Sequence, residues 1–278
     1  IHTNDCILIC NGEIYNYCNL IHKYNLNKDL LCGHSDCEVI IHLYKKIGIN
    51  KMIKELDGVF SFILYDFISN KLIIGHDPIG VRSLYWFFDN GIGVASEMKC
   101  LTNFSKNIKM YPPGSYTEFL IQSKEINTIN YYNFIYPQIN DNETLIMNNL
   151  RLKLNNAVKK RLMSEQPIGC LLSGGFDSSL ITALSIKNIK NIKTFSIGLS
   201  DSPDIIAAQK VADYLNTDHT SIILTEEEML QGIEETIKQI ESYDITTIRA
   251  STPMYLLSKY IRDNTNIKVI PKKIFPIL

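Results

Sequence analysis

Short apolar runs separated by Gly, Asn and Asp dominate the first half of the chain. Runs rich in β-branched and aromatic residues, bounded by turn formers, are typical of strands. They predict strands at residues 7–10, 59–65, 72–75, 84–88, 93–95 and 116–122, with a turn at Asp89-Asn-Gly91. Residues 38–44 have a helical pattern, and Ser35 is a candidate N-cap. We therefore expect a mixed, strand-rich N-terminal region.

The period of the pattern changes after a polar, turn-prone stretch at residues 137–144. An apolar stripe at helical spacing follows, made of Ile146, Leu150, Leu154, Ala157, Val158 and Leu162. Predicted strands at 168–172, 194–199, 221–224 and 268–270 then alternate with predicted helices at 178–186, 205–215, 225–240 and 250–262. The third of these helices begins with a Thr225–Glu228 capping box. Such alternation predicts a parallel sheet with helices on both faces and ligands beyond the carboxyl ends of its strands. We expect domains at 1–136 and 145–278, joined by a linker at 137–144.

Composition narrows the class of protein. Hydrophobic residues make up 45% of the chain, as in globular proteins, and the net charge is −1. A chain with this charge balance is not predicted to bind nucleic acid or an anionic membrane by its charge. No apolar run reaches the ~20 residues needed to span a bilayer. The seven cysteines include no CxxC pair and match no zinc spacing. We expect reduced cysteines and a cytoplasmic protein.

The sharpest local signal is Leu171-Leu-Ser-Gly-Gly-Phe-Asp-Ser-Ser179, between a predicted strand and a predicted helix. Backbone N–H groups of Gly174, Gly175 and the helix start can bind phosphate oxygens, and the hydroxyls of Ser173 and Ser178 add donors. Asp177 suits Mg²⁺ that bridges phosphates. The loop lacks the lysine of a Walker loop and resembles the S-G-G-x-D-S signature of ATP pyrophosphatases, which cleave ATP to AMP and pyrophosphate. The alternative is an ordinary strand–helix turn with Asp177 as a cap.

The resemblance to ATP pyrophosphatases implies ATP and Mg²⁺, with Leu172 and Ile197 bordering the nucleotide. The segment from Ser242 to Ser258 resembles the aspartate-side segment of asparagine synthetases. Arg249, beside the hydroxyls of Thr246 and Thr247, suits an amino-acid carboxylate. The alternative is a surface arginine at a helix start with threonines as caps. A β-lactam-forming synthetase of the same architecture is a further alternative, which the Thr-Thr-Ile-Arg-Ala-Ser run disfavours.

The N-terminal half resembles the class II glutamine amidotransferase domain of the same family. The motifs that carry this likeness are Asn11-Gly-Glu-Ile-Tyr-Asn16, Ser35-Asp-Cys-Glu38, Leu56-Asp-Gly-Val-Phe-Ser-Phe62, Asp77-Pro-Ile-Gly-Val-Arg-Ser-Leu-Tyr85, Ala95-Ser-Glu-Met-Lys99 and Pro113-Gly-Ser-Tyr116. The resemblance implies that Asn11 and Gly12 supply oxyanion donors, and that Glu13 and Asp36 hold the α-amino group of glutamine. The alternative for Asn11-Gly12 is a hairpin turn after the first strand.

The whole fold implied is α/β: an Ntn-type αββα glutaminase domain followed by a parallel α/β adenine-nucleotide-hydrolase-like domain, both expected to be truncated. The implied reaction converts aspartate, glutamine and ATP to asparagine, glutamate, AMP and pyrophosphate through an aspartyl adenylate. Partners are then these small molecules, with no nucleic acid and no membrane, and a homodimer of the full-length enzyme is compatible with the resemblance.

The chain departs from the family at several points. The family's N-terminal cysteine nucleophile, its glutamine-clamping arginine and its S-G-E-G segment do not appear, while His76 and Ser83 stand where Arg and Pro are usual. We therefore expect a fragment truncated at both ends. The alternative function is a catalytically inactive remnant that at most binds nucleotide, and this is the behaviour expected of the 278 residues as they stand.

Overall fold

A computed structural model describes residues 1–26, 35–89, 91–138 and 140–270. The chain forms two compact units, Ile1–Gln138 and Ile139–Leu278. Asn90 of the predicted turn lies outside the described residues, as does the end of the chain from residue 271. In the described part, no helix is both long and apolar enough to cross a membrane.

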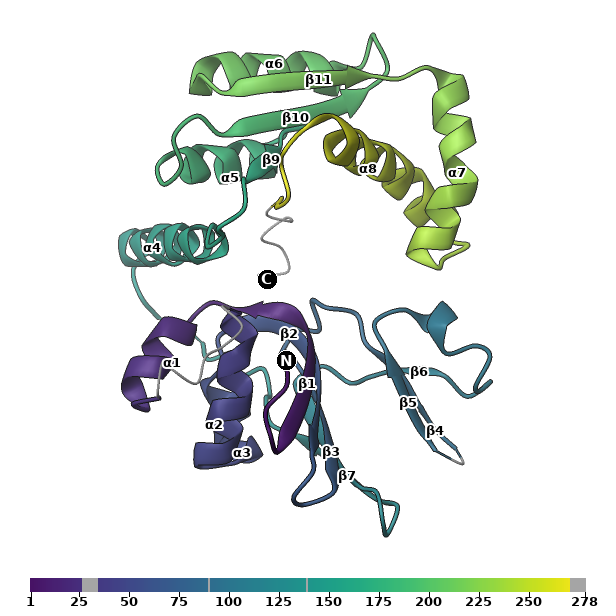
Figure 1. Cartoon of the computed structure of the whole chain (residues 1–278). Coiled ribbons are helices and arrows are strands. Elements are labelled where there is room, and N and C mark those ends of the chain that lie inside the picture. Colours follow the sequence, from purple (N-terminus) through teal and green to yellow (C-terminus); the bar gives the residue numbers. More distant parts are fainter. Residues whose placement is uncertain (27–34, 90, 139, 271–278) are drawn as a thin grey trace. The chain divides into compact units, whose positions relative to one another are not determined.

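The first unit is built on an antiparallel sheet of five strands in the order β1-β2-β3-β7-β8, with a smaller sheet in the order β5-β4-β6 (Figure 1). The strands are β1 Cys6–Ile14, β2 Gly58–Asp66, β3 Lys71–His76, β4 Tyr85–Phe88, β5 Ile92–Ala95, β6 Lys109–Met110, β7 Ser115–Leu120 and β8 Glu125–Asn130. The helices are α1 Tyr17–Lys23, η2 Asp36–Glu38, α2 Val39–Ile47, α3 Ile49–Glu55 and η3 Met98–Cys100.

Neighbouring residues of β3 show how this unit is layered. Ile73 packs in the cluster that the large sheet makes with α1, α2 and α3, where Leu43 and Phe60 are fully buried. Ile74 points to the opposite face and packs with Leu84 and Tyr111 beside the small sheet. Helices therefore cover one face of the large sheet, and the small sheet lies against the other.

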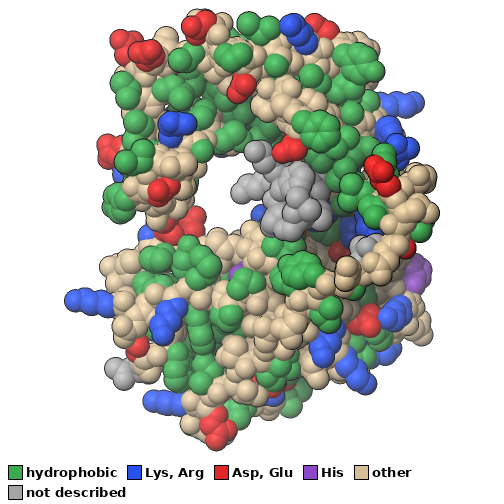
Figure 2. Space-filling model, turned by 180° about the vertical axis from the view of Figure 1, so that it is seen from behind, with side chains coloured by type: hydrophobic (Ala, Val, Ile, Leu, Met, Phe, Trp, Pro, Cys, Tyr) green, Lys and Arg blue, Asp and Glu red, His purple; other side chains and the backbone are tan. Residues whose placement is uncertain are grey.

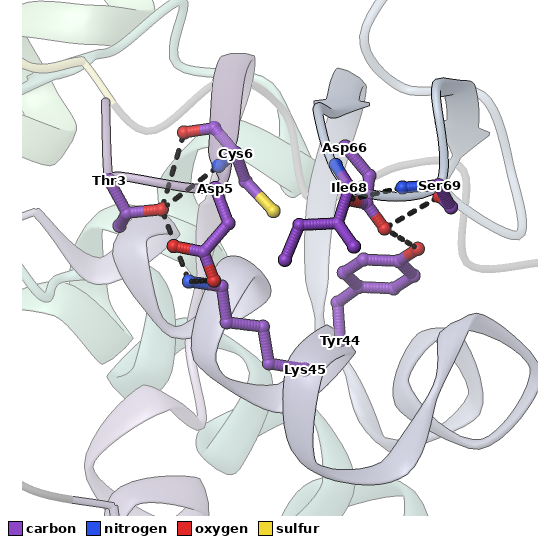
Figure 3. A network of polar contacts seen from close by, with 8 residues as sticks. All are labelled: Thr3, Asp5, Cys6, Tyr44, Lys45, Asp66, Ile68 and Ser69. Carbon is purple, nitrogen blue, oxygen red and sulfur yellow. Dashed lines mark hydrogen bonds and ion pairs between the residues drawn. The ribbon is translucent and has the colours of Figure 1, made fainter.

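A polar network ties α2 to the ends of β1 and β2 (Figure 3). Tyr44 donates its hydroxyl to Asp66 Oδ2 at 2.8 Å, and Lys45 lies 2.8 Å from a carboxylate oxygen of Asp5. Burial raises the pKa of Asp66, but hydrogen bonds from Ser69 and Tyr44 outweigh it, and the net shift is downward. Burial and the neighbouring Asp66 raise the pKa of Tyr44. The network holds α2 against the sheet.

The second unit has a parallel sheet in the order β11-β10-β9. Its elements are α4 Glu143–Arg161, β9 Gly169–Leu171, α5 Phe176–Ile186, β10 Lys193–Gly198, α6 Pro203–Leu215, β11 Asp218–Ile223, α7 Glu226–Ile240 and α8 Ile245–Asn264. A parallel bridge between Ile168 and Val269 places the segment after α8 beside β9, on the side away from β10. The sheet order therefore reverses at β9, which is the topological switch point of a doubly wound sheet.

The two faces of this sheet are covered by different helices. Phe195 of β10 packs with Leu257 and Ile261 of α8, whereas Leu172 packs with Ala208 and Ala212 of α6. This arrangement confirms the predicted parallel sheet with helices on both faces.

Helix α4 begins at Glu143, inside the predicted linker, and buries less of its stripe than expected. Ala157 and Val158 are buried against α5, but Ile146 and Leu150 are exposed. Hydrophobic side chains are frequent on the surface of this unit, as the green atoms of Figure 2 show.

A hydroxyl–imidazole network lies between β10 and β11. His219 Nδ1 is 2.9 Å from Thr194 Oγ1, and His219 Nε2 is 3.1 Å from Ser196 Oγ. Ser196 Oγ also lies 3.0 Å from Ser221 Oγ. Burial lowers the pKa of His219, against the opposing effect of Asp213. The surroundings of the imidazole thus favour its neutral form over its charged form.

Candidate functional site

The residues expected to form the oxyanion site lie in the second half of β1. The strand continues past the predicted end at residue 10 to Ile14, with Asn11 opposite Ser61 and Gly12 opposite Phe60. The alternative of an Asn-Gly hairpin turn is therefore wrong. A Cβ atom at Gly12 would lie 2.3 Å from the Val59 carbonyl oxygen, so only glycine fits against β2 here.

Asp36 reaches β1 from the short helix η2. Ser35, predicted to cap the helix at residues 38–44, caps η2 instead, its Oγ accepting from the Cys37 N–H at 3.3 Å. The N-cap of α2 is Glu38. Asp36 Oδ2 accepts from the Ile14 N–H at 2.5 Å, which fixes the carboxylate at the end of the strand. The structure thus brings Asp36 to the same strand that carries Asn11, Gly12 and Glu13.

A loop at residues 77–83 supports these strand residues, and its backbone is organised by the buried Asp77. Asp77 Oδ1 accepts from the N–H groups of Ile79 and Gly80 at 2.9 and 2.7 Å. Oδ2 accepts from the N–H groups of Val81 and Phe60 at 3.0 and 3.2 Å. Since the carboxylate collects donors from the loop and from β2, it sets the loop's position on the sheet.

The loop is linked to two candidate residues, to Glu13 directly and to Asn11 through Ser96. Arg82 Nη2 lies 3.6 Å from Glu13 Oε1. Ser83 donates its hydroxyl to the Ser96 carbonyl at 2.8 Å, and Ser96 Oγ accepts from Asn11 Nδ2 at 3.2 Å. One of the two N–H groups of the Asn11 amide is thereby directed to Ser96. Arg82 lies in the Asp77–Tyr85 motif and Ser96 in the Ala95–Lys99 motif, but the sequence predicted no role for either, because their contacts join segments that are far apart in the chain.

The phosphate-loop candidates occupy the predicted strand–loop–helix context. Leu172 donates its N–H to the Phe195 carbonyl at 2.8 Å beyond the end of β9, and Gly175 is the N-cap of α5. Ser173 N–H donates to Ser178 Oγ at 3.2 Å, and Ser178 Oγ donates to the Gly175 carbonyl at 3.1 Å. The serines therefore close the loop on itself at the helix N-terminus.

Gly174 takes the left-handed conformation, with a φ of 74°. A Cβ atom there would lie 2.5 Å from the Ala207 carbonyl carbon and the Ala208 nitrogen of α6. The loop thus rests directly on the backbone of the neighbouring helix, which only a glycine allows. Ile197 lies near the end of β10, at the same carboxyl edge of the sheet.

Asp177 is exposed in the first turn of α5. No cluster of three His, Cys, Asp or Glu side chains suited to a metal occurs among the described residues. A single carboxylate is compatible with Mg²⁺ when phosphate oxygens and water complete its shell, so the residues present fit a metal that arrives with a nucleotide.

The aspartate-side residues lie at the start of α8, which begins at Ile245 and not at the predicted residue 250. The cause is Asp244, an N-cap that the sequence interpretation overlooked: its Oδ2 accepts from the N–H and the hydroxyl of Thr247, each at 2.7 Å. Thr247 therefore takes part in capping, as the alternative held. Thr246 and Arg249 are exposed. Within the described segments, no hydrogen bond or ion pair joins these three residues to the phosphate loop.

Comparisons with known proteins agree across both units. Residues 2–144 match the family described as Glutamine amidotransferase domain, and residues 149–270 match Asparagine synthase. Glutamine-hydrolysing asparagine synthetases of Rattus norvegicus and Homo sapiens are each 40% identical over 294 residues, covering 95% of this chain and 52% of theirs. The chain thus spans about half the length of these relatives. Among solved structures, a glutamine phosphoribosylpyrophosphate amidotransferase from B. subtilis is 17% identical, with a TM-score of 0.41 over 84% of this chain and 52% of that one.

Proposed function

Because the chain belongs to the glutamine-hydrolysing asparagine synthetase family, we propose that it serves asparagine biosynthesis. The reaction proposed for the whole protein is the ATP-dependent amidation of aspartate with ammonia from glutamine. Its products are asparagine, glutamate, AMP and pyrophosphate. A β-lactam-forming synthetase is less well supported, since the relatives that match over 95% of this chain are asparagine synthetases.

The observation that carries this proposal is the position of the Ser173–Ser178 loop. It follows β9, where the sheet order reverses, and leads into the N-terminus of α5. Ligands of doubly wound sheets bind in the crevice beyond such a switch point, and a helix N-terminus favours negative charge. Backbone N–H groups at Gly174 and Gly175 would bind the phosphates of ATP, with Leu172 and Ile197 bordering the nucleotide.

In the second unit, Asp177 would hold Mg²⁺ together with the phosphate oxygens. The metal would supply positive charge against the charge that develops on the departing pyrophosphate. Arg249 would bind a carboxylate of aspartate with its planar guanidinium, and the hydroxyls of Thr246 and Thr247 would add donors. For Thr247, substrate would have to compete with Asp244 for the hydroxyl.

In the first unit, Asn11 and Gly12 would stabilise the oxyanion that forms when the glutamine amide is attacked. The Asn11 amide can offer one N–H to Ser96 and the other to the substrate oxygen. Glu13 and Asp36 would bind the α-amino group of glutamine. The nucleophile and a homodimer of the whole protein stay predictions from the family resemblance, and a cytoplasmic location stays a prediction from the composition.

Nucleotide binding tests the proposal on the chain itself. Calorimetric titration of the 278-residue chain with ATP, with and without Mg²⁺, is expected to show one site that pyrophosphate competes for. Asp177→Asn should keep pyrophosphate binding but lose the increase in ATP affinity that Mg²⁺ gives. The matched control is Asp204→Asn, a change in the first turn of α6. If ATP and pyrophosphate both fail to bind a folded chain, the proposed role of the loop is wrong. Asparagine formation by a longer polypeptide containing this chain tests the reaction.

A further inference from the structure

Two cysteine side chains lie close together beside the proposed glutamine site. Cys10 is on β1 and Cys37 is in η2, and Cys10 packs against the apolar cluster that contains Cys37. Cys37 Sγ donates to the Gly12 carbonyl at 3.4 Å. Cys10 and Gly12 are two residues apart on β1 and so point to the same face of the sheet. Their side chains are close enough that Cys10 acts on the pKa of the Cys37 thiol.

The two thiols differ in their access to solvent. Cys10 is partly exposed, while Cys37 is 5% exposed. The neighbouring Cys10 side chain, followed by burial, raises the pKa of the Cys37 thiol. A reagent in solution therefore meets Cys10 first, and Cys37 can react only with a group already attached to its neighbour.

We propose that Cys10 and Cys37 form a reversible disulfide by exchange with a small-molecule disulfide. The thiolate of Cys10 attacks one sulfur of the reagent, whose S–S bond breaks and releases one thiol. The Cys37 thiol then loses its proton and attacks the Cys10 sulfur, which releases the second thiol. In sum, two protein thiols lose two electrons and two protons, and the reagent is reduced to two thiols.

The bond would act on the strand that carries the candidate residues. It removes the S–H donor that now reaches the Gly12 carbonyl, and it ties β1 covalently to η2, which carries Asp36. On the proposed function, oxidation would therefore change the geometry of the glutamine site. The thiol chemistry needs no bound ligand, so its test is independent of that function.

The test incubates the full chain with oxidised glutathione and maps the cysteine peptides by mass spectrometry without reduction. The expected product is a peptide pair joined through Cys10 and Cys37, which a dithiol reductant separates again. Cys37→Ser should stop at a stable glutathione adduct on Cys10, since the resolving thiol is gone. Cys10→Ser should leave Cys37 unmodified while the chain stays folded.

Cys18 and Cys100 provide the matched controls because both are free and exposed. Serine at either position should leave the Cys10–Cys37 link unchanged. A link from Cys10 or Cys37 to another cysteine, including Cys32, would overturn the proposal. So would glutathione adducts on Cys18 and Cys100 with no link between Cys10 and Cys37 under the same conditions.

Discussion

Replacing Gly174 with alanine tests whether the phosphate loop is built as the structure indicates. The new Cβ would lie 2.5 Å from backbone atoms of Ala207 and Ala208, and 2.6 Å from the Ala207 Cβ. An L-residue in the left-handed region costs roughly 1–2 kcal/mol. Overpacking adds about 1–3 kcal/mol. Together they predict a loss of about 2–5 kcal/mol in the free energy of unfolding, or a displaced loop that no longer binds phosphate.

The matched control is Gly175→Ala, one residue along. Gly175 has a φ of −71°, and its Cβ would meet only Ser173 Oγ, at 3.6 Å. We expect a loss of at most about 1 kcal/mol there, the scale of a weaker N-cap. Urea unfolding followed by circular dichroism, and calorimetric titration with pyrophosphate, measure both effects. If Gly174→Ala matches the unsubstituted chain in stability and in pyrophosphate affinity, the contact between the loop and α6 does not exist as described.

Three further predictions follow from the polar networks. Tyr44→Phe removes the hydroxyl that Asp66 accepts and should lower the free energy of unfolding by about 1–3 kcal/mol, read from urea midpoints; an unchanged midpoint would contradict the network. Because burial lowers the pKa of His219 below its ordinary 6.5, stability is complete above that pH and should fall as the pH drops through the folded-state pKa. His219→Gln should flatten this dependence in melts taken across the acid range, and a curve of unaltered shape would refute the assignment. Asp77→Asn leaves loop N–H groups without an acceptor and should cost about 1–3 kcal/mol in the same urea assay, whereas wild-type stability would show that the loop does not depend on Asp77.

Local patterns predicted the elements that carry the phosphate loop, because the strand, the small-residue loop and the helix start are adjacent in one short segment of the sequence. The Thr225 capping box was likewise predicted and is present. It could be predicted because its two partners are only three residues apart in the sequence. The start of α8 was misplaced because Asp244 stands before a run of β-branched residues that have no strong helix propensity. Strand β8 was missed because it is a polar edge strand, exposed along most of its length.

The support around the first site could not be predicted from local pattern. Asn11 and Ser96 are 85 residues apart, and Glu13 meets Arg82 only because the loop after β3 folds back to β1. Such contacts depend on the pairing of β1 with β2 and of β2 with β3, which periodicity alone does not specify. The extension of β1 to Ile14 has the same origin, since pairing with Gly58 overrides the turn tendency of Asn-Gly.

Pyrophosphate binding to the folded 278-residue chain tests the central claim most directly, because it needs no catalysis and no second substrate. Titration followed by the backbone amide resonances should shift residues of the Ser173–Ser178 loop first, and ATP should displace the pyrophosphate from that loop. Shifts confined to other parts of the second unit, or none at all at saturating pyrophosphate, would contradict a nucleotide site at the end of β9.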